Sequence, residues 1–138
     1  MRSCWSFFFL AGLAGYVTTA HADTNLLEDM VTLDQAYSPV LSVTTNEQLQ
    51  ASQKAMARLE KTWAQFKSRH YEAMPNDAQR KMDIDYIDNK FKESAAIIAT
   101  GKNLKDAHQA IESARETLLS MRSRNNISYY IDNLTRFH

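Results

Sequence analysis

The stretch that decides the fold reads LQASQKAMARLEKTWAQFKSRH, from Leu49 to His70. Seven of its residues recur at intervals of three or four: Leu49, Ser52, Met56, Leu59, Trp63, Phe66 and His70. This spacing places them on one face of an α-helix, with largely polar residues on the other face. We therefore predict a helix that begins near Asn46, ends before Met74-Pro75-Asn76, and buries this face against other helices.

A stretch before this helix has the same periodicity. Its apolar face is Leu26, Met30, Leu33, Tyr37 and Val40. Asn25 and Glu28 have the spacing of a capping box, which predicts that the helix begins there. Pro39 is expected to kink or end this helix, because proline lacks an N–H and crowds the preceding turn.

Two more helices are predicted after Pro75. The third begins at Asn76, with Gln79 in the capping-box position, and stops at Gly101, a residue type common just after a helix. Its inward face is Ile84, Ile87, Phe91, Ala95 and Ile98. The fourth begins with Asn103 and Asp106, and its inward face is Leu104, Ala107, Ile111, Ala114, Leu118 and Met121.

The links near Thr44, Pro75 and Gly101 are only a few residues long, which favours antiparallel neighbours. A last amphipathic segment contains Ile127, Tyr130, Ile131, Leu134 and Phe137. We thus predict an all-α fold, an antiparallel up-down-up-down four-helix bundle with a short C-terminal fifth helix.

Residues 1–22 have the pattern of a cleaved secretory signal peptide. Arg2 precedes an apolar run, and Ala20-His-Ala22 fits a small-residue cleavage site. A membrane anchor is the alternative, but the run from Trp5 to Val17 is shorter than the roughly 20 residues that span a bilayer. We expect a periplasmic or secreted location, with residues 23–138 as one helical domain.

The composition narrows the classes of partner. Sixteen basic and sixteen acidic residues give zero net charge, which provides no electrostatic reason to expect nucleic acid or an acidic membrane surface. The single cysteine, Cys4, lies in the signal, so no disulfide is expected in the exported domain.

Antiparallel threading should gather histidine and methionine at one end of the bundle. The residues expected there are Met30, His70, Met74, Met82 and Met121, and the chain closes on His138. Thioether and imidazole ligands favour Cu(I), and a methionine facing a histidine can hold haem iron. The alternative is ordinary core packing, in which methionine fills gaps and His70 is a half-buried core residue. His108 is expected at the opposite end.

Two short patches carry a resemblance. Leu27-Glu-Asp-Met30 and Gly101-Lys-x-Leu-Lys-Asp-Ala107 resemble soluble periplasmic b-type cytochromes of the four-helix-bundle class. The resemblance implies haem b bound by Met30. That family's histidine near the end of the fourth helix has no counterpart, since Ser120, Met121 and Arg122 stand there, and His70 or His138 would have to substitute.

No catalytic constellation is found. The exported domain has no cysteine, no serine lies in a glycine-flanked elbow, and no glutamate has a histidine three residues later. We therefore expect no enzyme, but a carrier or sensor of copper or haem that uses Met30, His70 and Met121. The alternative is a cofactor-free periplasmic interaction or chaperone-like protein that presents Tyr129, Tyr130 and Phe137 to a partner.

Overall fold

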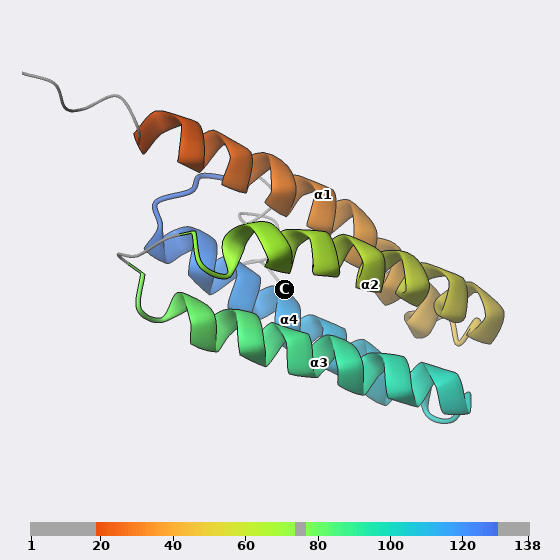
Figure 1. The fold of residues 1–138 in the computed structure, drawn as a ribbon. Helices are drawn as coiled ribbons and strands as arrows, with labels where there is room; N and C mark the ends of the chain where they lie inside the picture. Colours follow the sequence, from red (N-terminus) through yellow and green to blue (C-terminus); the bar gives the residue numbers. More distant parts are fainter. Residues whose placement is uncertain (1–18, 74–76, 130–138) are drawn as a thin grey trace, which may run out of the picture.

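The computed structural model describes residues 19–73 and 77–129, with side chains from residue 25 onward. This part of the chain is all-helical and contains no strand. Its four helices are α1 (Thr19–Thr45), α2 (Leu49–His70), α3 (Arg80–Thr100) and α4 (Leu104–Arg124), which form a bundle (Figure 1). The prediction of an all-α helical bundle is confirmed for these residues.

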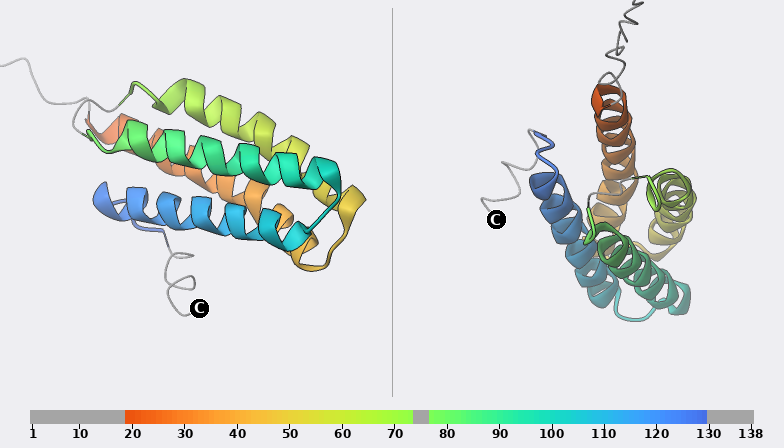
Figure 2. Two further views of the ribbon diagram at one scale, coloured as in Figure 1. Left: turned by 90° about the horizontal axis from the view of Figure 1, so that it is seen from below. Right: turned by 60° about the vertical axis from the view of Figure 1, so that its left-hand side comes forward.

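The helices pack as two close pairs, α1 with α2 and α3 with α4, as the views in Figure 2 also show. Polar contacts identify the helix ends that meet. Asp29, early in α1, bonds to His70 at the end of α2, and Arg124 at the end of α4 bonds to Asp83, early in α3. We call this end of the bundle, with the start of α1 and α3 and the end of α2 and α4, the His70 end.

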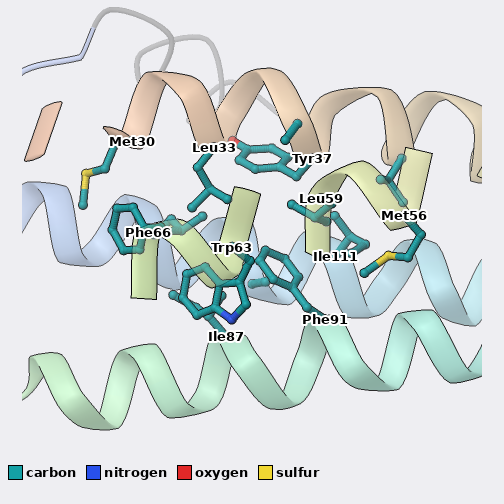
Figure 3. Close-up of a cluster of buried hydrophobic side chains, with 14 of the residues drawn as sticks. Met30, Leu33, Tyr37, Met56, Leu59, Trp63, Phe66, Ile87, Phe91 and Ile111 are labelled. Atoms are coloured by element: carbon teal, nitrogen blue, oxygen red, sulfur yellow. The ribbon is translucent and has the colours of Figure 1, made fainter. Parts of the chain in front are cut away.

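One continuous core runs between the helices. Figure 3 shows Met30, Phe66 and Trp63 pointing into the space that the helices enclose. The inward faces predicted for the first and fourth helices are fully buried. Two predicted core positions are wrong: Leu49 is 36% exposed because it opens α2 at the edge of the core, and Ala95 is only half-buried because its neighbour Ser94 faces inward.

Two helix boundaries also differ from prediction. The helix α1 begins at Thr19, so Asn25 lies inside the helix and does not cap it. The same helix continues through Pro39 to Thr45. Pro39 has no N–H to donate to the carbonyl of Gln35. Both residues are exposed, so water can satisfy that carbonyl.

The stop at Gly101 is confirmed. Gly101 caps α3 with a left-handed backbone, φ +66°, and its N–H donates to the carbonyl of Ile98. Asn103 precedes α4, where its amide donates to the carboxylate of Asp106 and makes no side-chain bond to the backbone N–H groups of the helix.

Several predictions concern residues outside the described part. They include residues 1–18 of the predicted signal at 1–22, Pro75, and all of the predicted fifth helix beyond Tyr129; residues 127–129 are described and are not helical. Among the described helices, none combines the length and apolar character needed to cross a membrane.

Candidate functional site

The structure places three of the predicted ligand residues in the core. Met30 and Met121 are 0% and 1% exposed, and His70 is buried at the end of α2. Met82 is 65% exposed on α3, so a metal held by the buried sulfur atoms would leave it out. Met74 and His138 lie outside the described residues, as do Tyr130 and Phe137.

The His70 ring is held from two sides. Its Nε2 lies 2.7 Å from Oδ2 of Asp29, and its ring packs at 4.6 Å, centroid to centroid, against Phe66. The other carboxylate oxygen of Asp29 accepts a hydrogen bond of 2.7 Å from Arg69. Because a carboxylate only accepts, Nε2 carries the proton, and Nδ1 is left with a lone pair. No described residue hydrogen-bonds to Nδ1.

The electrostatics of this end keep the imidazole neutral. Burial lowers the pKa of His70 below 6.5, and the charges of Arg80 and Arg69 lower it further, while the hydrogen bond and charge of Asp29 oppose the shift. A neutral imidazole is the form that ligates metals. The site therefore presents an unprotonated nitrogen at neutral pH.

Arg80, in the first turn of α3, is a functional candidate that the sequence analysis missed. It is 1% exposed, and its Nε and both Nη atoms are buried without a hydrogen-bond partner. Burial lowers the pKa of its guanidinium, and the charge of Asp77 opposes that shift. A signal was available, because Arg80 extends the spacing of Ile84, Ile87 and Phe91 by one turn.

A buried ion pair lies between α1 and α4. Arg122 and Asp34 are 2% and 4% exposed, and Nη1 of Arg122 lies 3.3 Å from Oδ1 of Asp34. Burial is the main cause that raises the pKa of the Tyr37 hydroxyl, and the charge of Asp34 is the next. The ring of Tyr129 lies over the Arg122 guanidinium, 5.2 Å from ring centroid to Cζ. Tyr129 thus packs on its own chain. Helical periodicity marks Asp34 and Arg122 only as neighbours of apolar positions, so the sequence analysis did not identify the pair.

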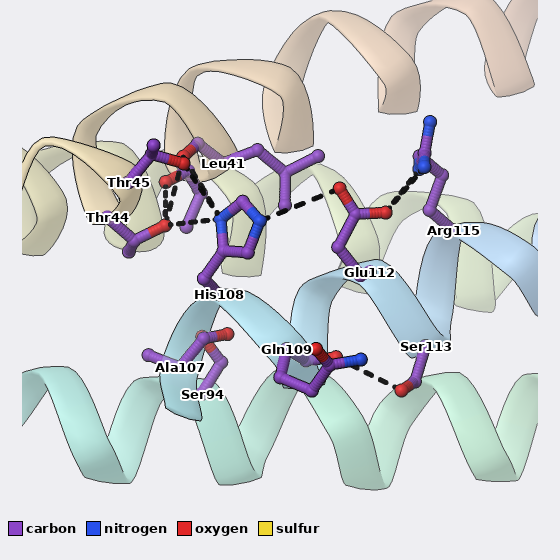
Figure 4. Close-up of polar contacts among 11 residues, drawn as sticks. Leu41, Thr44, Thr45, Ser94, Ala107, His108, Gln109, Glu112, Ser113 and Arg115 are labelled. Atoms are coloured by element: carbon purple, nitrogen blue, oxygen red, sulfur yellow. Dashed lines mark hydrogen bonds and ion pairs between the residues drawn. The ribbon is translucent and has the colours of Figure 1, made fainter. Parts of the chain in front are cut away.

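The opposite end of the bundle has a different polar arrangement, drawn in Figure 4. There Nδ1 of His108 lies 3.2 Å from the Thr44 and Thr45 hydroxyls and from the Leu41 carbonyl. Its Nε2 lies 3.8 Å from Glu112. As predicted, His108 is at the far end from His70, and its Nδ1 has hydrogen-bond partners.

A groove of about 580 Å³ opens between α2 and α3. Trp63 and Phe91 contribute to its lining, with Lys67 and Lys92 beside them. Its polar groups are already engaged, because Asp88 accepts a 2.8 Å bond from Trp63 Nε1 and pairs with both lysines. The groove therefore has fewer unsatisfied groups than the His70 end.

Among the described residues, no three histidine, cysteine, aspartate or glutamate side chains group closely enough to hold a metal. Comparisons of the chain with protein-family models, curated proteins and solved structures give no match.

Proposed function

We propose that this chain is an exported carrier or sensor that binds copper or haem b at the His70 end of an antiparallel up-down-up-down bundle. The observation that carries the proposal is the His70 ring, whose Nε2 is bonded to Asp29 while Nδ1 has no partner among the described residues. Histidines that ligate metals commonly donate their other ring N–H to a carboxylate in this way. His70 would be the imidazole ligand.

Met30 and Met121 are the proposed sulfur ligands. Both belong to the buried core that runs through the bundle, Met30 from α1 and Met121 from the last turn of α4. Two thioethers with one imidazole would suit Cu(I), and one methionine with His70 would suit haem iron. Met74, Met82 and His138 are further candidate ligands, of which Met82 would have to turn inward from its exposed position.

A second candidate function is an interaction or chaperone-like protein without a cofactor. Tyr129 is the observation that bears on it, because its half-buried ring lies over Arg122, just before the segment with Tyr130 and Phe137. A short fifth helix in this segment would present these aromatic residues to a partner. This candidate requires no ligand at His70.

The test is the absorption spectrum and metal content of protein purified from the periplasm of an expressing bacterium. A Soret band identifies haem, one equivalent of copper without a Soret band identifies Cu(I), and neither favours the interaction protein. His70→Ala should abolish ligand binding and leave helical content nearly unchanged. His108→Ala, at the far end, should retain the ligand, and equal loss in both variants contradicts the proposed site.

Asp29→Asn separates positioning from ligation. It keeps a hydrogen-bonding group near His70 but removes the carboxylate, so affinity should fall by roughly 10–100-fold. Unchanged affinity would mean that the Asp29 contact is purely structural.

N-terminal sequencing of the same protein should start at Asp23, and an intact residue 1 in a membrane fraction would contradict export by cleavage.

A further inference from the structure

The buried guanidinium of Arg80 has no acceptor for its N–H groups. An arginine carries five donors in a fixed planar fork, and none of the three Arg80 nitrogens has a hydrogen-bond partner. A buried charge without a partner destabilises the fold, in contrast to a buried apolar side chain of similar size. An acceptor for this group would remove most of that cost.

The acidic groups at this end of the bundle accept hydrogen bonds from other donors. Asp77 accepts from Arg124 and Asn125, Asp83 accepts from Arg124, and Asp29 accepts from Arg69 and His70. The nearest acid in electrostatic terms, Asp77, makes no hydrogen bond to the Arg80 side chain. The described residues therefore supply no carboxylate oxygen to the guanidinium.

A second open group lies at the same end. Nδ1 of His70 has no hydrogen-bond partner among the described residues, but it is not one of the side-chain atoms that are buried from solvent without a partner. His70 is the last residue of α2, and Arg80 is the first residue of α3. The unsatisfied group is therefore the guanidinium fork of Arg80, and the imidazole lone pair at the same end of the bundle is open to a ligand.

We propose that Arg80 is the anchor of an oxyanion site at the His70 end and binds the carboxylate of a ligand. The planar fork of arginine matches a carboxylate with two parallel N–H···O bonds. Two sources have this chemistry, namely a carboxylate carried on an iron porphyrin and a free small carboxylate. The site goes beyond the proposed function, because it needs no metal.

The proposed anion site also distinguishes between the two cofactors of the preceding section. A bare Cu(I) ion would be placed near an uncompensated guanidinium, and like charges in a poorly solvated site repel. A porphyrin with carboxylate arms provides the missing acceptor. Haem b therefore fits this end of the bundle better than copper alone.

The test compares three probes on ligand-free protein expressed from the full chain: hemin, hemin dimethyl ester, and succinate. The ester lacks the carboxylates but keeps iron and the macrocycle. Wild-type protein should bind hemin roughly tenfold or more tightly than the ester, the factor that one charge-assisted hydrogen bond provides. Arg80→Met should remove that difference, and Arg58→Met, at an exposed arginine of α2, should retain it.

Succinate tests the free carboxylate. A rise in the melting temperature of wild type with succinate, absent in Arg80→Met, together with equal binding of hemin and its ester, would identify a small carboxylate as the ligand. In a chloride-free zwitterionic buffer without probe, Arg80→Met should melt at or above the temperature of wild type, because it removes an unsatisfied charge.

The proposal is overturned if wild type binds hemin and its ester equally and succinate leaves its melting temperature unchanged. It is also overturned if Arg80→Met melts well below wild type without any probe, since the guanidinium would then be satisfied in the unliganded protein. The first comparison uses wild type alone, so a variant that fails to fold does not block it. Hemin binding that survives in His70→Ala but is weakened in Arg80→Met would refute the proposed function and leave the oxyanion site standing.

Discussion

Replacing Trp63 by alanine should lower the free energy of unfolding by about 3–5 kcal/mol, the usual cost of truncating a buried tryptophan. Trp63 is 4% exposed, stacks on Phe66 at 5.5 Å and meets Phe91 edge-on at 5.2 Å. Its Nε1 also donates a 2.8 Å hydrogen bond to Asp88. The substitution therefore removes apolar burial, two aromatic contacts and one hydrogen bond together.

Trp63→Phe separates these contributions. A phenylalanine keeps a ring between Phe66 and Phe91 but loses the bond to Asp88. The carboxylate of Asp88 stays paired with Lys67 at 3.2 Å and Lys92 at 2.8 Å, so it is not left without a partner. The loss should then be about 1–2 kcal/mol, which is one net hydrogen bond plus a small reduction in volume.

Urea unfolding followed by circular dichroism measures both values. Fluorescence is unsuitable because Trp63 is the only tryptophan after residue 22. Gln65→Ala, at an exposed position of the same helix, serves as the control and should change the free energy of unfolding by less than about 0.5 kcal/mol. A loss below about 1 kcal/mol for Trp63→Ala, or equal losses for alanine and phenylalanine, would refute the reasoning.

Three further predictions concern the helix end, the buried ion pair and pH. Gly101→Ala should lower the free energy of unfolding by about 1–2 kcal/mol in urea melts, because its φ of +66° is left-handed and the new Cβ would lie 2.9 Å from Cδ2 of Leu49. Arg122→Met should cost about 3–5 kcal/mol in the same assay by leaving Asp34 buried without this partner, and adding Asp34→Leu should restore most of the loss; a double variant no better than the single one would contradict this. Since burial sets the pKa of His70 in the folded protein below the 6.5 of the unfolded chain, the unfolded chain binds the proton more readily. The urea midpoint of wild type should therefore fall as the pH drops through 6.5 towards the folded-state pKa, and His70→Gln should show a smaller fall over the same interval; parallel pH profiles would exclude His70 as the titrating group.

Much of the fold is readable in the sequence because helical periodicity is local. The spacing of Met56, Leu59, Trp63 and Phe66 defines one face whatever lies opposite, and all four are buried. Gly101 ends α3 because only a residue without a Cβ adopts its backbone conformation at little cost. The prediction that Met30, His70 and Met121 lie at one end used only the order of the helices and the short links between them.

The candidate site depended on what lies across the bundle. The sequence of α2 shows that His70 faces inward, but the proton position on its ring is set by Asp29, which is 41 residues away in the chain. Arg80 extends an apolar face, yet only packing decides that its guanidinium is buried and that Asp77 is bonded elsewhere. Periodicity determines which residues face the core. Hydrogen-bond partners and the burial of charge instead depend on contacts between residues far apart in sequence. Those contacts are fixed only when the four helices pack.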